Sequence, residues 1–356
     1  MNIVEATRSY EKWLGSHVAL VASDIKLKHD GMQASAFCLL RATYYRWIAL
    51  WPKACPELDT APKVLGVGDL HIENFGTWRD GEARLVWGID DFDEACAAPY
   101  TNDLVRLAAS VLVAVEEGTL TLDGRKACDE ILAGYARQIA SRDAAPFVLE
   151  EDNAHLRALA MTDDKSPDKF WKKLARAPRT AAPEKIKTLL AQHLPRGTRP
   201  IAYARRTAGM GGLGLPRFVA LGTHDGGYVA REAKARAPRA ATWLSGGEPR
   251  PAELQTILAQ AVRAADPFLH ETPDWVVRRL APHCGRVALE DIENGRQRRE
   301  VLHAMGRETA NVHWGDRKAA AKIVKDLAAR KPSWLYRAAQ RMAEATLDDW
   351  QAWRKR

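Results

Sequence analysis

Two acidic blocks constrain this 356-residue chain more than any other feature: Gly68-Asp-Leu-His-Ile-Glu-Asn74 and Gly88-Ile-Asp-Asp-Phe-Asp93. Each block follows or overlaps a short apolar run that predicts a brief strand, Val64–Val67 for the first and Arg84–Ile89 for the second. Asp80-Gly81 between these runs is a strong turn signal, so we expect the two strands to pair as a hairpin. The hairpin would bring together the polar side chains that follow its strands, namely Asp69, Asn74, Asp90, Asp91 and Asp93.

Carboxylates held this close repel one another and raise one another's pKa, so they need a cation. Mg²⁺ together with bound nucleotide phosphates is the usual solution. The offset of five from Asp69 to Asn74 (74 − 69) equals the spacing in a kinase catalytic loop, where the Asp takes the acceptor's proton and the Asn holds the metal. We therefore predict Asp69 as a catalytic base and Asn74 and Asp91 as Mg²⁺ ligands.

The ordered blocks resemble those of the aminoglycoside-phosphotransferase branch of the protein-kinase-like superfamily. They are most similar to a bacterial domain-of-unknown-function family with Gly-Asp-x-His-x-x-Asn-Phe-Gly, Asp-Phe-Asp-Glu and Arg-Leu-Ala-x-Ser blocks, here Gly68–Gly76, Asp91–Glu94 and Arg106–Ser110. The resemblance implies an ATP- and Mg²⁺-dependent phosphotransferase with a small-molecule acceptor. It also implies that Asp103 braces the catalytic loop from the start of a helix. Val67-Gly68 stand where protein kinases have His-Arg, and this departure argues against a conventional protein kinase.

A nucleotide-binding lobe does not fit before the first block, because only 67 residues precede Gly68 and most of them read as helical. The pattern of strand, glycine loop, strand, turn and strand instead occurs downstream, from the glycine block to Lys234. Such a loop lets backbone N–H groups approach phosphates, and a lysine on the last strand can pair with them. The predicted cofactor-binding residues are Gly209, Gly211, Gly212, Gly214 and Lys234, with Arg231 as the alternative to Lys234 and Glu253 as a weak candidate for the acidic partner.

This order reverses that of an ordinary kinase and predicts a circularly permuted, two-lobed α+β fold. Residues 1–195 would form a helical catalytic lobe, 196–282 a small β-rich nucleotide lobe, and 283–356 helices that return to the first lobe. Met305–His313 resembles the helix that runs into the catalytic loop in an ordinary kinase. Chain ends often lie close together in compact domains, so a permutation of this kind is physically tolerable.

Several helical features follow from periodicity. Apolar residues spaced three and four apart predict a single helix face directed at the core, made of Phe37, Leu40, Tyr44, Trp47 and Trp51. Asn102 is expected to cap a helix that ends at Gly118. We interpret Arg41 and Arg106 as solvated or snorkelling side chains, with an inward direction as the alternative. His71 is expected to support the loop by hydrogen bonding, while Glu73 and Asp90 could join the metal shell or face solvent.

The net charge of +8 is unevenly distributed. Residues 165–206 contain twelve Lys or Arg against two acidic residues, a local charge of +10 (12 − 2), and five prolines interrupt them. We interpret this segment as a basic surface insertion or linker that could also attract nucleotides or nucleic acid. Five cysteines without metal-site spacing indicate reduced thiols in a cytoplasmic protein, and no signal peptide or membrane span is visible.

Three functions compete. The favoured one is an ATP·Mg²⁺-dependent kinase-like enzyme acting on a small molecule. A metallophosphoesterase is disfavoured, because Asp69-Leu-His71 is not followed by a Gly-Asn-His block. The third is a non-catalytic or AMP-transferring nucleotide-binding protein, which could bind nucleic acid through residues 165–206. The acceptor and the oligomeric state stay open.

Overall fold

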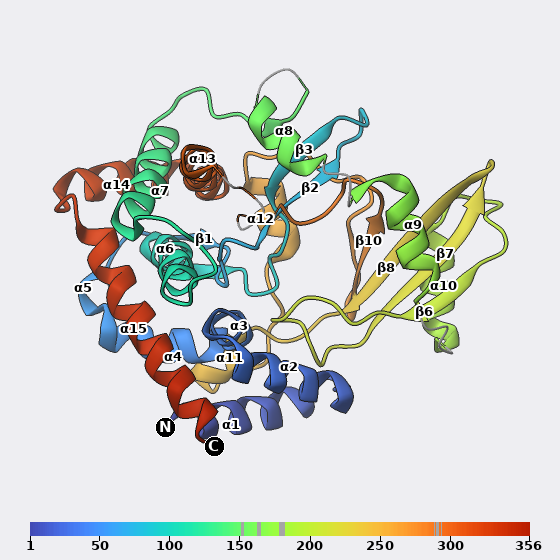
Figure 1. The fold of residues 1–356 in the computed structure, drawn as a ribbon, viewed down its shortest axis with the longest axis horizontal. Helices are drawn as coiled ribbons and strands as arrows, with labels where there is room; N and C mark the ends of the chain where they lie inside the picture. The colour runs from blue at the N-terminus through green and yellow to red at the C-terminus, as the bar shows by residue number, and fades with distance from the viewer. Residues whose placement is uncertain (151–152, 162–164, 178–181, 288, 290–291, 293) are drawn as a thin grey trace.

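The computed structural model describes residues 1–150, 153–161, 165–177, 182–287, 289, 292 and 294–356. It is a mixed α+β fold in which a helical part and a five-stranded antiparallel sheet lie side by side (Figure 1). The helices include α1 Ile3–Gly15, α2 Ala22–Ala34, α3 Ala36–Ala42, α4 Tyr44–Ala54, α5 Pro56–Asp59, α6 Tyr100–Glu116, α7 Gly124–Ile139, α8 Ala154–Ala160, α9 Pro167–Ala175, α10 Glu184–His193, α11 Ala240–Ser245, α12 Leu254–Gln260, α13 Gly295–His313, α14 Arg317–Ala329 and α15 Trp334–Arg354.

The centre of the helical part is α6, which is buried on nearly every side because α7, α13 and α15 surround it. Helices α7 and α13 approach each other closely where each carries a glycine. A Cβ at Gly134 would lie 2.0 Å from the carbonyl oxygen of His303, and a Cβ at Gly306 would lie 2.0 Å from that of Ile131. Only glycine permits this contact, which fixes the position of the end of α13 beside the first acidic block.

Two predictions about helices need correction. The five residues expected on one helix face are all buried, but they are divided between α3 and α4 because the chain breaks at Thr43. Asn102 does not cap α6, since the helix starts at Tyr100, directly after Pro99. Asn102 is instead buried in the first turn, where its side-chain oxygen accepts a hydrogen bond from Nε1 of Trp47 at 2.9 Å.

The strand pairing around the acidic blocks differs from the predicted hairpin. The strands are β1 Lys63–Gly66, β2 Phe75–Arg79, β3 Leu85–Ile89, β4 Cys96–Pro99 and β5 Phe147–Val148. The hairpin joins β2 to β3, and β1 pairs with β4. A tight turn pairs the segments that flank it directly, so the turn at residues 80–84 selects β2, a strand that we did not predict. The blocks still meet, because the N–H of Asp90 donates to the carbonyl of Asn74 at 3.0 Å.

The larger sheet has the strand order β6-β7-β8-β10-β9. Its strands are β6 Ala202–Arg205, β7 Arg217–His224, β8 Gly227–Ala235, β9 His270–Glu271 and β10 Trp275–Leu280. The predicted sequence of strand, glycine loop, strand, turn and strand is confirmed by the register of β6 with β7 and of β7 with β8.

The basic segment 165–206 is not a simple linker. It supplies α9, α10 and β6, although residues 178–181 lie outside the described residues. Ile186, Leu190 and Leu194 pack on one face of the sheet, and α9 packs on the other. The boundary predicted at residue 195 therefore falls between α10 and the sheet that it covers.

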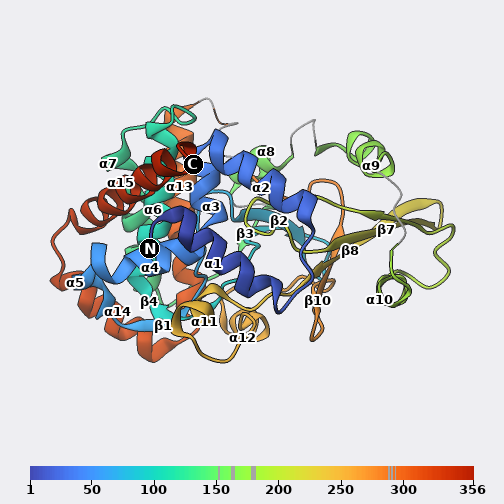
Figure 2. The ribbon, with the colours of Figure 1, turned by 90° about the horizontal axis from the view of Figure 1, so that it is seen from below.

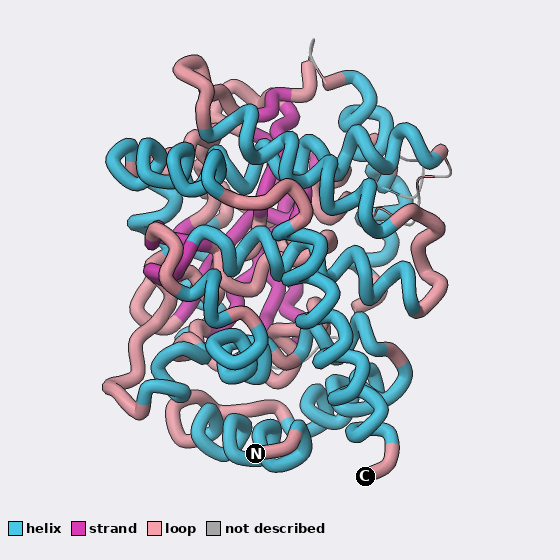
Figure 3. The backbone as a smooth tube through the Cα atoms, turned by 90° about the vertical axis from the view of Figure 1, so that its left-hand side faces the viewer, coloured by secondary structure: helices cyan, strands magenta, loops and turns pink. Residues whose placement is uncertain are grey.

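The C-terminal helices return to the helical part, and α15 packs along α6 and beside α1 (Figure 2). The two chain ends lie at the same edge of the molecule (Figure 3). Arg46 links the two ends of the chain, because it donates to the carbonyl of Met1 at 2.9 Å and to Asp349 at 2.7 Å. All five cysteines are free thiols. No helix in the described part of the chain combines the length and the apolar character needed to cross a membrane.

Candidate functional site

A cleft of about 660 Å³ separates the larger sheet from the helical part. Its walls include the sheet, the glycine loop and the two acidic blocks, together with Arg41 from α3 and Arg286 from the segment before α13. The charged and glycine residues of the lining include Arg41, Asp69, Glu73, Asp90, Asp91, Asp93, Arg206, Gly209, Gly211, Gly212, Arg217, Lys234, Arg278 and Arg286, and His71 and Asn74 line the cleft as well. Most of the predicted site residues are thus brought to one cavity, although they come from segments far apart in the sequence.

Asp103 braces the first acidic block as expected. Its carboxylate accepts hydrogen bonds from the backbone N–H groups of Val67 at 2.6 Å and Gly68 at 2.9 Å. The same carboxylate lies 2.9 Å from Nε2 of His313, whose Nδ1 lies 2.8 Å from the hydroxyl of Tyr135. His313 is the last residue of α13, so the predicted packing of the 305–313 helix beside the loop is confirmed.

Asp69 is anchored through one of its two oxygens. Oδ1 accepts from Nε of Arg106 at 3.0 Å and from Nη2 at 2.5 Å, while a Cβ at Gly211 would lie 3.6 Å from the other oxygen, Oδ2. Arg106 is 1% exposed, and its Nη2 also donates to the carbonyl of Leu40 at 2.6 Å. The solvated interpretation of Arg106 was therefore wrong. Burial raises the pKa of Asp69, and the lowering effect of Arg106 only partly offsets it.

The helix around Arg106 contained a signal that we missed. α6 is apolar on almost every face, so no solvent-facing side remains for a charged residue. An arginine on such a helix has to be buried, and a buried arginine needs a carboxylate. Arg41 was also misjudged, because it forms an ion pair with Glu73, and Arg286 contacts the same carboxylate. Glu73 therefore pairs with arginines.

Asn74 and Asp91 offer oxygen atoms to a hard cation. Asn74 is 5% exposed, and its side-chain oxygen has no hydrogen-bond partner among the described residues. Asp91 lies at the same wall and is half exposed, and one of its oxygens accepts from the N–H of Asp93 at 3.2 Å. An orphaned buried carbonyl oxygen beside a carboxylate fits the ligand preference of Mg²⁺. Within the described residues, no group of three or more His, Cys, Asp or Glu is placed to hold a metal, so phosphate or water oxygens would have to complete the shell.

Lys234 reaches this wall from β8. Its Nζ contacts Asp93 and lies 3.9 Å from Asp91. Partial loss of solvation in the cleft acts to raise the pKa of Asp91, but Lys234 and the N–H of Asp93 outweigh it, so this pKa is lowered. The pKa of Asp93 is raised by the same partial loss of solvation and by the neighbouring Asp91.

Two further predictions are wrong: Arg231 as the alternative to Lys234, and Glu253 as the acidic partner of Lys234. Arg231 lies on the opposite face of β8, with its guanidinium 4.6 Å from the ring centroid of Phe268, because side chains three apart on a strand point to opposite faces. It does not line the cleft. Glu253 pairs with Arg239 at 3.0 Å and not with Lys234.

A cluster of arginines above the carboxylates was not predicted. Glu232 is fully buried and contacts Arg206, Arg217 at 3.1 Å and Arg278 at 2.9 Å. Burial acts to raise the pKa of Glu232, but the three arginines outweigh it and hold this pKa well below its ordinary value. Three guanidinium groups against one carboxylate give this cluster a net positive charge. The signal was the spacing of Glu232 and Lys234, which places both on one face of the strand.

The last glycine of the glycine loop lies apart from the other three. Gly209, Gly211 and Gly212 line the cleft, and a Cβ at Gly212 would lie 3.3 Å from Cε of Lys234. Gly214, by contrast, packs against α2, where a Cβ would lie 2.4 Å from Ile25, and it is absent from the cleft lining. The prediction that Gly214 covers the cleft was wrong.

The structure also places His71 and Asp90, two side chains near the carboxylates. His71 is buried, and its Nδ1 accepts from the N–H of Glu73 at 3.2 Å, which agrees with the expected supporting role. Burial and three neighbouring arginines lower the pKa of His71 well below its ordinary value. Asp90 lines the cleft beside Asp91, and burial raises the pKa of Asp90 to about 6.

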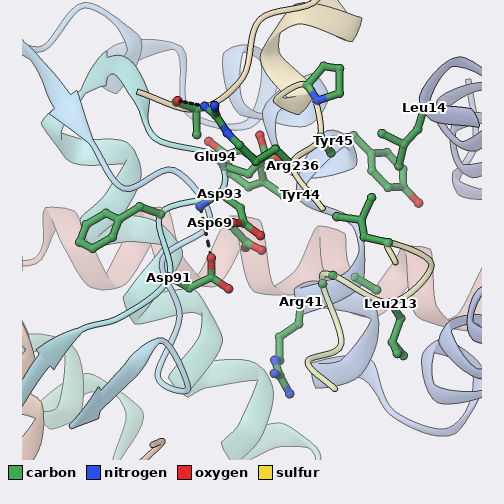
Figure 4. A pocket seen from close by; sticks show the side chains of 18 of the residues that line it. Leu14, Arg41, Tyr44, Tyr45, Asp69, Asp91, Asp93, Glu94, Leu213 and Arg236 are labelled. Atoms are coloured by element: carbon green, nitrogen blue, oxygen red, sulfur yellow. Dashed lines mark hydrogen bonds between the residues drawn. The ribbon is translucent and has the colours of Figure 1, made fainter. Parts of the chain in front are cut away.

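A second cavity of about 100 Å³ lies on the other side of the acidic wall. It shares Asp69, Asn74, Asp91, Gly211 and Gly212 with the cleft. Figure 4 shows the carboxylates of Asp69, Asp91 and Asp93 together on one side of this cavity, with Tyr45 and Leu14 across it. The two cavities therefore meet at Asp69, which is reached from both.

Over residues 20–199, just over half of the chain, the sequence matches the family described as "uncharacterized protein conserved in bacteria (DUF2252)". Neither the curated proteins nor the solved structures gave a match.

Proposed function

The chain belongs to this bacterial family, and we propose that it is an ATP- and Mg²⁺-dependent phosphotransferase with a kinase-like site and a small-molecule acceptor. The observation that carries the proposal is the orphaned buried oxygen of Asn74 beside Asp91, opposite Lys234 and the glycine loop across one cleft. Oxygen ligands on one wall and cationic groups on the other are what a nucleotide triphosphate with its metal requires.

The phosphate side of the site is assigned to the sheet. Lys234 and the arginines around Glu232 attract phosphate oxygens, and Arg is well suited to bidentate phosphate contacts. The backbone of Gly211 and Gly212 lies beside Lys234 and Asp69, where N–H groups can approach phosphates without side-chain obstruction. Apolar side chains further along the cleft, Phe170, Leu269 and Leu280, offer a surface for the base.

The chemical step is assigned to Asp69. Arg106 holds Oδ1 and fixes the orientation of the carboxylate, so Oδ2 remains available to accept the proton of an acceptor hydroxyl. The raised pKa of Asp69 favours this role, because a general base works best when its pKa approaches the working pH. Mg²⁺ held by Asn74 and Asp91 would neutralise charge on the phosphates when bound.

We also propose membership of the protein-kinase-like superfamily in a circularly permuted form. Three observations support it: the order of the acidic blocks and the glycine loop, the bracing of the first block from the end of α13, and the adjacency of α1 and α15. The five free thiols support a reducing, cytoplasmic location. Nucleic-acid binding through residues 165–206 is not favoured, because much of this segment folds against the sheet.

Product analysis tests the proposal and separates it from AMP transfer. The protein is incubated with ATP, Mg²⁺ and the protein-free metabolite fraction of a bacterial extract, and the nucleotides are separated by chromatography. We expect ADP, whose formation stops without Mg²⁺ and falls at least about 10²-fold in Asp69→Asn. The matched control Asp225→Asn, at an exposed turn, should retain full activity. Formation of pyrophosphate and of an AMP–acceptor adduct would indicate adenylyl transfer, and consumption of no ATP would contradict both.

A further inference from the structure

The smaller cavity contains polar groups that the proposed chemistry does not use. Lys28 on α2 is 4% exposed and lines this cavity, yet it has no hydrogen-bond or ion-pair partner among the described residues. Tyr10 and Tyr44 line the same cavity, and their hydroxyl groups likewise lack a hydrogen-bond partner within the described part of the chain. Three polar side chains that line one cavity without a protein partner point to a ligand there.

The charge of Lys28 is not needed to balance the neighbouring carboxylates, because each of these has a partner of its own. Glu11 pairs with His29 at 2.7 Å, and Asp69 pairs with Arg106. Asp93 is contacted by Lys234. Burial lowers the pKa of Lys28, and the carboxylates of Glu11, Asp69 and Glu94 act in the opposite direction, but none of them pairs with Lys28 directly.

The groups that face the cavity without a protein partner are donors, whereas the carboxylates of Asp69, Asp91, Asp93 and Glu271, which also line it, each lie beside a lysine or arginine. Lys28 offers three N–H bonds, and each tyrosine offers one O–H. Burial raises the pKa of Glu94 well above its ordinary value, which favours the neutral form that can donate a hydrogen bond. One of its oxygens already accepts from the N–H of Ala240 at 2.7 Å. Donors without a protein partner favour a ligand that brings acceptor oxygens to them.

The size of the cavity limits the ligand. A dry cavity of about 150 Å³ accommodates benzene, so about 100 Å³ limits the ligand to a compact molecule of about the size of a three-carbon acid. The cavity opens at Asp69 and Gly211 into the cleft, where a reacting group of the ligand could meet a bound nucleotide.

We propose that this cavity binds the acceptor, and that the acceptor is a small hydroxy acid whose carboxylate pairs with Lys28 while its hydroxyl faces Asp69. The assignment of an acceptor rests on the proposed function. In the transfer, the hydroxyl oxygen forms a bond to the γ-phosphorus of ATP, and the bond from that phosphorus to the β,γ-bridging oxygen breaks. ADP leaves with the bonding electrons, and the hydroxyl proton passes to Oδ2 of Asp69. Tyr10 and Tyr44 donate hydrogen bonds to the acceptor's remaining oxygens.

The test compares three probes with nearly the same carbon skeleton: glycerate, glycerol and serinol, which present a carboxylate, a hydroxyl and an ammonium-bearing group. Binding to the full-length protein is measured by ligand-observed NMR without nucleotide. We expect saturable binding of glycerate that is at least about tenfold tighter than that of the other two. Lys28→Met should weaken glycerate binding by at least about tenfold. Lys26→Met, an exposed position on the same helix, should leave it unchanged.

Tyr10→Phe is a second variant, which keeps the ring and removes only the hydroxyl. It should weaken glycerate binding several-fold. If Lys28→Met fails to fold, Tyr10→Phe alone tests the proposal. Stronger binding of glycerol or serinol, unchanged glycerate binding in both variants, or no binding of any probe would overturn the proposal. The titration needs no ATP, so a protein that binds glycerate but no nucleotide would refute the phosphotransferase and leave the hydroxy-acid site intact. Glycerate that binds but is never phosphorylated would remove only its role as acceptor.

Discussion

Asp69 combines a proposed chemical role with a structural one. Its partner Arg106 is buried, and a second contact to the carbonyl of Leu40 holds the guanidinium in place. A buried arginine that loses its negative partner keeps the cost of its desolvation. A loss of activity in an Asp69 variant therefore has to be separated from a loss of stability.

We predict that Asp69→Asn lowers the free energy of unfolding by about 2 kcal/mol, because a charge-assisted hydrogen bond becomes a neutral one beside a buried cation. The double variant Asp69→Asn/Arg106→Met should lose less than the sum of the two single changes. Urea denaturation followed by circular dichroism measures all three. Strictly additive losses would show that the two residues are not coupled.

Glu308 on α13 is a second buried carboxyl with a consequence for stability. It accepts from the N–H of Ile89 at 3.3 Å and from Asn311 at 3.1 Å, and burial raises its pKa to about 7. The folded state therefore holds a proton that the unfolded chain releases near pH 4.5. The stabilising contribution of this proton is complete below pH 4.5 and is lost as the pH rises to about 7.

We expect Glu308→Gln to remove this pH dependence. The difference in unfolding free energy between wild type and variant should change by roughly 3 kcal/mol between pH 4.5 and pH 7, with the wild type losing stability as the pH rises. Titrating groups that both proteins share cancel in the difference. A difference that stays constant across this range would show that Glu308 is ionised throughout.

Among the elements, the glycine loop between β6 and β7 connects the two cavities. Its middle residues approach Asp69 on one side and Lys234 on the other, and a Cβ at Gly211 would lie 3.1 Å from the carbonyl oxygen of Arg41. An added methyl group there has to displace the loop from the helical part or from the cleft.

We predict that Gly211→Ala weakens ATP binding by about tenfold, or roughly 1.4 kcal/mol, without a comparable loss of stability. Gly81→Ala in the β2–β3 turn is the matched control, since a Cβ there meets nothing within 4 Å. Equilibrium titration with a fluorescent ATP analogue gives both affinities. Equal affinities in the two variants would place the loop away from the nucleotide.

The strands differ in how well the sequence predicts them. β6, the glycine loop, β7 and β8 follow one another along the chain, so local turn and strand signals were enough to predict them. The pairing of β1 with β4 joins segments about thirty residues apart, and no local signal specifies such a partner. The same holds for side chains: Lys234 could be predicted from its place on a strand, but its contact with Asp93 is a tertiary fact.

At the scale of the whole molecule, the proposed site exists because two parts of the chain face each other across the cleft. The sheet supplies positive charge, the helical part supplies carboxylates, and Lys234 contacts Asp93 across the cleft. Arg106 and the cluster around Glu232 were not predicted, because a charged residue on a helix or strand pairs internally only when its face is buried, and burial is set by the tertiary structure. The acidic blocks were informative alone, since several carboxylates in a few residues require a cation in any fold.

The most direct test of the account is calorimetric titration of the full-length protein with ATP, with and without Mg²⁺, in wild type, Asp91→Ala and Lys234→Met. We predict that wild type binds ATP in the presence of Mg²⁺ and that the removal of Mg²⁺ or of Asp91 weakens binding to a similar, low level. Lys234→Met should weaken binding whether Mg²⁺ is present or not, because it removes a phosphate contact. Asp91 is half exposed, so its substitution should leave the fold intact. ATP binding that is indifferent to Mg²⁺ and to both substitutions, or no binding by the folded wild type, would contradict the central claim.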